Sequence, residues 1–294
     1  MSMRKKVLLD TDIGSDIDDV VSLAYLLVQP DCELVGITTV TGQAIGRARI
    51  ASALCYAAGK PDIPIYPGSE SPLLITQRQT KAPQTKALSQ WEHQRHFEKG
   101  TAVEFMRRTI RENPGEITLL AVGPLTNIAL LFAVDNEIPL LLRELVLMCG
   151  AFTDYFRFAE WNAKLDPHAT HMVYNAPVTR HQSIGLDVTT KVQMPSAAVR
   201  DQFQSNPVLD AVLSFAEVYF QEHDTMIFHD PLAAASLFDD ELCNFRRGDV
   251  RVEVNDAEKR GKMYWQPDTY GVHEVAMYVN PERFFQHFFA QFKT

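Results

Sequence analysis

The residues best suited to chemistry lie near the N-terminus, in the run DTDIGSDIDD that spans residues 10–19. Its carboxylates belong to Asp10, Asp12, Asp16, Asp18 and Asp19. Carboxylates this crowded repel one another and raise each other's pKa unless a cation neutralises them. Hard cations such as Ca²⁺ and Mg²⁺ prefer oxygen ligands. The run therefore predicts a metal site, and the alternative is a solvated acidic loop that caps the next helix.

A second candidate combines an acid, an aromatic ring and an amide in Glu160, Trp161 and Asn162. The acid and the amide can hydrogen-bond vicinal hydroxyls while the ring covers an apolar face of a ligand. The competing interpretation is the start of a surface helix, with Asp166 as a cap. These residues alone do not separate the two interpretations.

A third candidate is His229, which Asp230 follows directly. Histidine is the side chain best suited to proton transfer near neutral pH, and the aspartate can complete a metal site. The competing interpretation is a helix start with Asp230 as N-cap and Pro231 as the first helical residue, and the two interpretations are compatible. A strand that breaks at Gly123-Pro124 also leaves a backbone carbonyl that a hard cation accepts as a ligand.

The candidate residues follow segments that are typical of buried strands. We expect strands at residues 7–9, 33–40, 64–66, 117–122, 145–148 and 178–186. We expect helices at residues 19–29, 45–59 and 101–112, and from residue 126 onward. This alternation predicts an α/β fold with an open, mainly parallel sheet flanked by helices, as in a Rossmann-like core. Ligands of such sheets bind beyond the carboxyl ends of the strands, where the acidic run lies.

The sequence indicates a single domain. No repeat or linker divides it, so we expect residues 1–294 to form a single domain. The polar, glutamine-rich stretch 70–98 lacks periodicity, and we expect a long loop or a mobile flap there, with no function assigned.

Composition excludes several classes of protein. The net charge is −9 and no Lys/Arg-rich block occurs, which argues against nucleic-acid binding. No stretch approaches about 18 uncharged apolar residues, so we expect no membrane span. The N-terminus lacks the apolar core of a signal peptide. The four cysteines have no CxxC spacing and are typical of reduced thiols in a cytoplasmic protein.

Together, the segments resemble the inosine-uridine-type nucleoside N-ribohydrolases. DTDIGSDIDD is similar to the family's DTDxGxDD fingerprint, and GEITLLAVGPLTNIAL, VLMCGAF, AEWNAKLDP and FHDPLAAA resemble its later blocks in the same order. The tail MYVNPERFFQHFF resembles the closing strand and helix. The resemblance covers nearly the whole chain. It implies Ca²⁺-dependent hydrolysis of the N-glycosidic bond of ribonucleosides, and assembly as a homo-oligomeric dimer or tetramer.

The resemblance also implies roles for the matched residues. Asp12 would bind the metal and act as general base on a water. Asp19, Asp230 and the main-chain oxygen of Thr126 would complete the metal site. His229 would protonate the departing base or lie beside it. The substrate-binding residues would be Asp18, Gln43, Asp154, Glu160, Trp161 and Asn162, whereas Asp10 would support the loop.

The chain departs from the family pattern mainly where the substrate binds. Two extra residues lengthen the acidic run, so Asp16 is an alternative to Asp18 as the neighbour of Asp19. We favour Asp18, because the helical pattern starts directly after Asp19. Gln43 and Asp154 stand where the family commonly has asparagine, so the base preference and the substrate stay open. Candidates for stacking on the base are Tyr155, Phe156, Phe158, Trp161 and Tyr219.

Two other functions compete with hydrolysis of nucleosides. A phosphatase of the haloacid-dehalogenase type also starts with a strand and Asp-x-Asp, but it would leave the pair Asp18-Asp19 without a role. A non-catalytic nucleoside or ribosyl-compound binder could retain the metal pocket. The joint presence of Asp12 as base and His229 as acid argues against such a binder, which needs neither.

Overall fold

The computed structural model describes residues 4–204 and 206–293. In this part of the chain, nine strands form one sheet in the order β10-β9-β11-β6-β5-β4-β1-β2-β3. Its strands are β1 (Lys5–Thr11), β2 (Cys32–Thr39), β3 (Ile65–Pro67), β4 (Ile117–Ala121), β5 (Glu144–Leu147), β6 (His181–Ser183), β9 (Cys243–Val252), β10 (Met263–Pro267) and β11 (His273–Val279). β9 runs antiparallel to both of its neighbours, and the other pairs are parallel. The predicted fold class is therefore confirmed.

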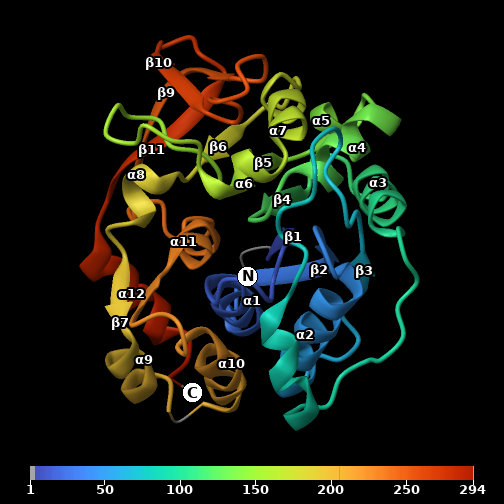
Figure 1. Cartoon of the computed structure of the whole chain (residues 1–294), viewed down its shortest axis with the longest axis vertical. Helices are drawn as coiled ribbons and strands as arrows, with labels where there is room; N and C mark the ends of the chain where they lie inside the picture. The colour runs from blue at the N-terminus through green and yellow to red at the C-terminus, as the bar shows by residue number, and fades with distance from the viewer. Residues whose placement is uncertain (1–3, 205, 294) are drawn as a thin grey trace.

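Helices cover both faces of this sheet, as Figure 1 shows. They are α1 (Asp18–Val28), α2 (Ala44–Ala57), α3 (Ala102–Glu112), α4 (Thr126–Val134), α5 (Ile138–Leu141), α6 (Trp161–Leu165), α7 (Pro167–Tyr174), α8 (Leu186–Thr189), α9 (Ser196–Gln202), α10 (Pro207–Tyr219), α11 (His229–Ala235) and α12 (Pro281–Ala290). The 3₁₀ helix η1 covers Pro83–Gln90, and β7 (Gln193–Pro195) and β8 (Thr225–Ile227) form a separate antiparallel pair.

The middle of the central strand β1, Val7–Leu9, shows why buried stretches of the sheet are apolar. Val7 and Leu9 belong to the core under α1, α2, α10 and α11, whereas Leu8 belongs to the core under α3 and α4. Successive side chains of a strand point to opposite faces. Because helices bury both faces, each position in this middle part of the strand is apolar. Leu120 and Leu119 of β4 divide between the two cores in the same way.

Two local expectations are wrong. The strand expected at residues 178–186 is confined to β6, because the chain turns at Gly185 into α8. Asp230 is not an N-cap: α11 begins at His229, its N-cap is Phe228, and no side chain caps it. The carboxylate of Asp230 therefore does not satisfy the backbone of its own helix.

The strands β1, β4 and β5 are neighbours, and their carboxyl ends place three loops side by side. The acidic run follows β1, Val122 follows β4, and Met148 follows β5. Of the helices described, none is both long and apolar enough to cross a membrane. The four cysteines are buried, free thiols.

Glu144, at the start of β5, contributes stability that depends on pH. It is 2% exposed and accepts hydrogen bonds from Thr118 (2.8 Å), Arg180 (2.9 Å) and Lys5 (3.2 Å). Burial alone would raise the pKa of Glu144, but these partners outweigh burial and hold it below the ordinary value. A depressed pKa in the folded state stabilises the protein above the unfolded-state pKa, and this stability is lost as the pH falls through the folded-state pKa.

We therefore expect Glu144→Gln to lower the free energy of unfolding by about 1–3 kcal/mol near pH 7. The difference from wild type should shrink in urea titrations at about pH 4, because the carboxylate of the unfolded chain, with an ordinary pKa of about 4.3, is partly protonated there. Glu116→Gln is a matched control, because Glu116 pairs with Lys6 at the surface and is 57% exposed. Its effect should stay below about 1 kcal/mol. A loss at Glu144 that is equal at both pH values would contradict this account.

Candidate active site

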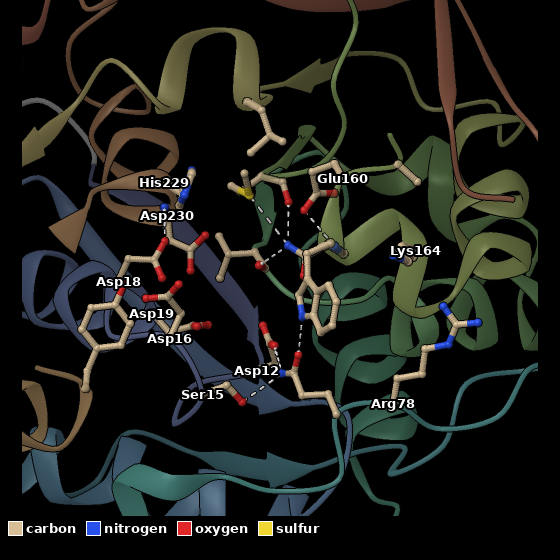
Figure 2. A pocket seen from close by; sticks show the side chains of 18 of the residues that line it. Asp12, Ser15, Asp16, Asp18, Asp19, Arg78, Glu160, Lys164, His229 and Asp230 are labelled. Atoms are coloured by element: carbon tan, nitrogen blue, oxygen red, sulfur yellow. Dashed lines mark hydrogen bonds between the residues drawn. The ribbon is translucent and has the colours of Figure 1, made fainter. Parts of the chain in front are cut away.

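A cavity of about 850 Å³ opens at the carboxyl ends of the central strands. Its wall brings together Asp12, Asp18 and Asp19 from the N-terminal run, Glu160, Trp161 and Asn162 from the middle of the chain, and His229 and Asp230. Figure 2 shows the aspartates, Glu160 and His229 around one hollow. The volume suits a small-molecule ligand. All three sequence candidates therefore contribute to one site.

The acidic centre of the cavity is the trio Asp18, Asp19 and Asp230. Each offers a carboxylate oxygen, and these oxygens all lie within 4.8 Å of one another. The backbone N–H of Asp230 donates to Asp18 Oδ2 (3.1 Å), and the Thr11 hydroxyl donates to Asp19 Oδ1. Burial, reinforced by repulsion between the carboxylates, raises the pKa of each member well above its ordinary value. Three buried hard oxygen donors of this kind fit a divalent cation, which would allow them to ionise together.

Asp12 lies in the same cavity but outside the trio. The amide of Gln79 donates a hydrogen bond to Asp12 Oδ2, and burial raises the pKa of this carboxyl group. A Cβ atom at Gly123 would lie 2.8 Å from Asp12 Oδ1, so only glycine allows this close approach. The missing side chain at Gly123, just after β4 ends, thus leaves room for Asp12, the candidate general base.

His229 lines the cavity from the first residue of α11. Its Nδ1 lies 2.7 Å from the hydroxyl oxygen of Thr189. Within residues 4–204 and 206–293 the ring makes no other hydrogen bond, which leaves Nε2 for a ligand. Burial lowers the pKa of His229 to about 4, so the ring is neutral near pH 7. If the Thr189 hydroxyl donates to Nδ1, the ring proton stays on Nε2 and can be donated to a ligand.

Glu160 both starts a helix and lines the cavity, so the two interpretations of its segment are compatible. It is the N-cap of α6, where Oε1 accepts from the backbone N–H of Asn162 (2.7 Å) and Oε2 accepts from Ala163 (3.1 Å). It also lines the cavity. The side-chain amide of Asn162 donates to the carbonyls of Val122 (2.8 Å) and Met148 (3.1 Å), which joins α6 to the ends of β4 and β5. The helix start therefore builds the wall of the site.

Two predicted site residues lie away from the cavity. Thr126 is the first residue of α4 and is absent from the cavity wall, and its hydroxyl donates to Asp166 (2.8 Å). Val122, four residues earlier, lines the cavity. Asp154 is exposed in the loop before α6 and does not contribute to the cavity wall.

Asp10 and Gln43 lie behind the cavity wall. Asp10 Oδ1 accepts hydrogen bonds from Thr38 (2.5 Å) and Asn127 (2.8 Å), which ties β1 to its neighbours. The side-chain oxygen of Gln43 accepts from the backbone N–H of Ala82 (2.7 Å) and so holds the glutamine-rich stretch. Gln43 also has a left-handed φ of 63°, which a non-glycine residue adopts only where its surroundings enforce it.

Gln79 is a residue of the site that the sequence analysis missed. It comes from the stretch 70–98, and its side chain bridges the cavity. Its oxygen accepts from Trp161 Nε1 (2.6 Å), while its nitrogen donates to Asp12 and to the hydroxyl of Ser15 (3.0 Å). The only signal in the sequence was the abundance of glutamine in this stretch.

The glutamine-rich stretch is a long loop that contains η1 and packs on the acidic run. The side chain of Gln84 donates to the carbonyl of Asp16 (2.7 Å). Arg47, which is fully buried, donates to the carbonyl of Lys81 (3.1 Å) and also to that of Asp12. These hydrogen bonds hold the glutamine-rich stretch against the loop that contains Asp12, the candidate general base.

The comparison with known proteins decides the family. Residues 7–286 match the family described as "Inosine-uridine preferring nucleoside hydrolase". The chain belongs to this nucleoside hydrolase family. It is therefore a hydrolase that acts on the N-glycosyl bonds of ribonucleosides, and the family is metal-dependent. The predicted resemblance is confirmed, and the phosphatase alternative does not agree with this finding.

Similar proteins support the same assignment. An uncharacterized protein of Schizosaccharomyces pombe is 31% identical over 283 residues, which cover 89% of this chain and 90% of the relative. A probable uridine nucleosidase of Oryza sativa is 29% identical and is aligned over 85% of this chain and 79% of its own length. A solved plant nucleoside hydrolase has the same fold, with a TM-score of 0.85, 23% identity and 99% of both chains covered. The nucleoside hydrolase fold thus extends over the described chain.

Proposed function

We propose that this nucleoside hydrolase uses Ca²⁺ and the residues of the described cavity to release ribose and a free base from ribonucleosides. The observation that supports the proposal is the convergence of the acidic trio, Asp12 and His229 in one cavity, although they come from opposite ends of the chain. A water molecule would supply the hydroxyl group to C1′ and a proton to the base.

The metal ligands in this proposal are Asp19, Asp230 and Asp12, with Asp18 beside them. Asp18 belongs to the trio, so we place it against both the cation and the ribose hydroxyls. Asp16 lines the cavity but lies outside the trio, which favours Asp18 over Asp16. We replace the main-chain oxygen proposed at Thr126 by that of Val122. A bound Ca²⁺ would lower the pKa of a water and orient the hydroxyls of the sugar.

Side chains of the cavity would carry out the proton transfers and bind the sugar and the base. Asp12 accepts the proton of the attacking water. The carboxylates around it stabilise the positive charge that develops on the ribosyl group as the C1′–N bond breaks. Neutral His229 donates a hydrogen bond to the departing base, and the proton that the base nitrogen takes up comes from the water. Glu160, Trp161 and Asn162 would bind the sugar, and Gln79 takes the place first proposed for Gln43.

Removal of the metal tests this function. After treatment with a chelator, the protein is expected to lose about 10³-fold or more in kcat on inosine or uridine, because a bound cation contributes several kcal/mol to catalysis. Added Ca²⁺ should restore the rate, which is measured as released ribose and free base. Mg²⁺ added in parallel identifies the preferred cation. Full activity in the chelated, metal-free protein would contradict the proposal.

The same assay separates catalysis from binding alone. A nucleoside binder that retained the metal pocket would bind inosine or uridine tightly and release no ribose. The predicted homo-oligomer, a dimer or tetramer, is tested by sedimentation, and the predicted cytoplasmic location is tested by fractionation.

A further inference from the structure

Three cations line the cavity away from its acidic centre. They are Arg78 and Lys81 of the glutamine-rich stretch and Lys164 of α6. In Figure 2, Arg78 and Lys164 lie on one side of the cavity, and Asp18 and Asp230 lie on the opposite side. The cavity therefore has a negative end, which suits a metal, and a positive end.

A second cavity, of about 430 Å³, adjoins the positive end. It shares Arg78 and Lys164 with the first cavity and adds Arg260. Its wall also holds one carboxylate, that of Glu258. Arg260 donates from Nε to the carbonyl of Val254 (3.1 Å). Cations from three separate parts of the chain thus line two cavities that share Arg78 and Lys164.

No ion pair within the described residues gives Arg78, Lys81 or Lys164 a structural role. Among the residues that the structure describes, the exposed side chains of Arg78, Lys81 and Lys164 take part in no ion pair and no hydrogen bond. The chain has 37 acidic and only 28 basic residues, so this group of cations gives one end of an otherwise acidic cavity a positive surface that attracts an anionic group. Guanidinium and ammonium groups bind phosphate by charge-assisted hydrogen bonds.

Lys164 lies near the proposed binding site of the ribose, so the positive end of the cavity is close to the sugar. Lys164 follows Glu160, the N-cap of α6, by four residues, and both residues line the same cavity. Glu160 is a proposed contact of the ribose. A ribose that turns its 2′ and 3′ hydroxyls to the acidic trio directs its 5′ carbon away from it, and a substituent there reaches the cations.

We propose that the preferred substrate is a ribonucleoside 5′-monophosphate, with Arg78 and Lys164 holding the phosphate and Lys81 and Arg260 beside them. The inference rests on the proposed N-glycosidic hydrolysis. The hydroxyl of water bonds to C1′, the C1′–N bond breaks, and its electron pair stays on the base nitrogen, which takes the proton. The phosphate ester is untouched, so the products are a free base and ribose 5-phosphate.

Competition between substrates tests the inference in the Ca²⁺-loaded protein. Wild type should show kcat/KM for UMP and IMP at least about tenfold above that for uridine and inosine. The double variant Arg78→Gln/Lys164→Gln should lower the ratio of monophosphate to nucleoside kcat/KM by about 100-fold, as expected for two lost charge-assisted contacts. Arg108→Gln/Lys293→Gln removes two exposed cations outside both cavities and should leave the ratio unchanged.

Binding of the product gives a readout that does not depend on turnover. By calorimetry, wild type should bind ribose 5-phosphate about tenfold or more tightly than ribose, and the double variant should lose this difference. Equal binding of the two sugars, or equal hydrolysis of nucleosides and monophosphates, would overturn the inference and leave nucleoside hydrolysis standing. Inorganic phosphate that binds as tightly as ribose 5-phosphate would overturn it too. Absence of base release from every substrate would instead refute the proposed function.

Discussion

Asp12→Asn is expected to lower kcat on inosine and uridine by about 10³–10⁴-fold while the fold is retained, because the amide cannot accept a proton from the attacking water. Asn has nearly the same volume as Asp, and Gly123 leaves room for either side chain. The amide can also keep a hydrogen bond with Gln79. The measurement is initial-rate kinetics at saturating Ca²⁺, with bound metal determined on the same sample.

The control for this variant is Asp62→Asn, an equal change of charge at an exposed position outside the cavity. It should leave kcat unchanged. If Asp12→Asn kept a rate near that of wild type, another group would have to accept the proton. If the rate fell only because Ca²⁺ was lost, Asp12 would be a metal ligand without a separate role as base.

His229→Ala is expected to lower kcat on inosine by about 10²–10³-fold, because the departing base then leaves without the hydrogen bond that the ring donates to it. p-Nitrophenyl riboside has a leaving group that needs little protonation, so its rate should change far less. Parallel kinetics on the two substrates measure this difference. The prediction depends on hydrogen-bond donation by a neutral ring, which agrees with the lowering of the His229 pKa to about 4 by burial.

His96→Ala is the matched control, because His96 is exposed and does not line the cavity. It should leave both rates unchanged. Equal slowing of inosine and p-nitrophenyl riboside by His229→Ala would mean that the ring positions other groups and does not act on the leaving base.

The order of strands and helices could be predicted because it depends on local physics. The buried middle of a parallel strand is apolar at successive positions, as in Val7–Leu9 of β1, and helices such as α1 end before a proline. The acidic run and the pair His229-Asp230 could be proposed as site residues because their chemistry is unusual wherever they lie in the fold. Their meeting in one cavity follows from the parallel sheet, which collects the carboxyl ends of neighbouring strands.

Other parts of the site depend on contacts between distant residues, which leave no pattern in the sequence. Gln79 reaches Asp12 across 67 residues and Trp161 across 82 residues, and a glutamine in a polar loop does not reveal this. Val122 and Thr126 lie in the same segment, and only the start of α4 at Thr126 shows which of them faces the cavity. Arg78 and Lys164 look like ordinary surface cations until the fold places them in one wall. The chemistry of a single side chain can thus be predicted from the residue type. Contacts between side chains that are distant in the sequence form only when the chain folds, so they can be found only in the tertiary structure.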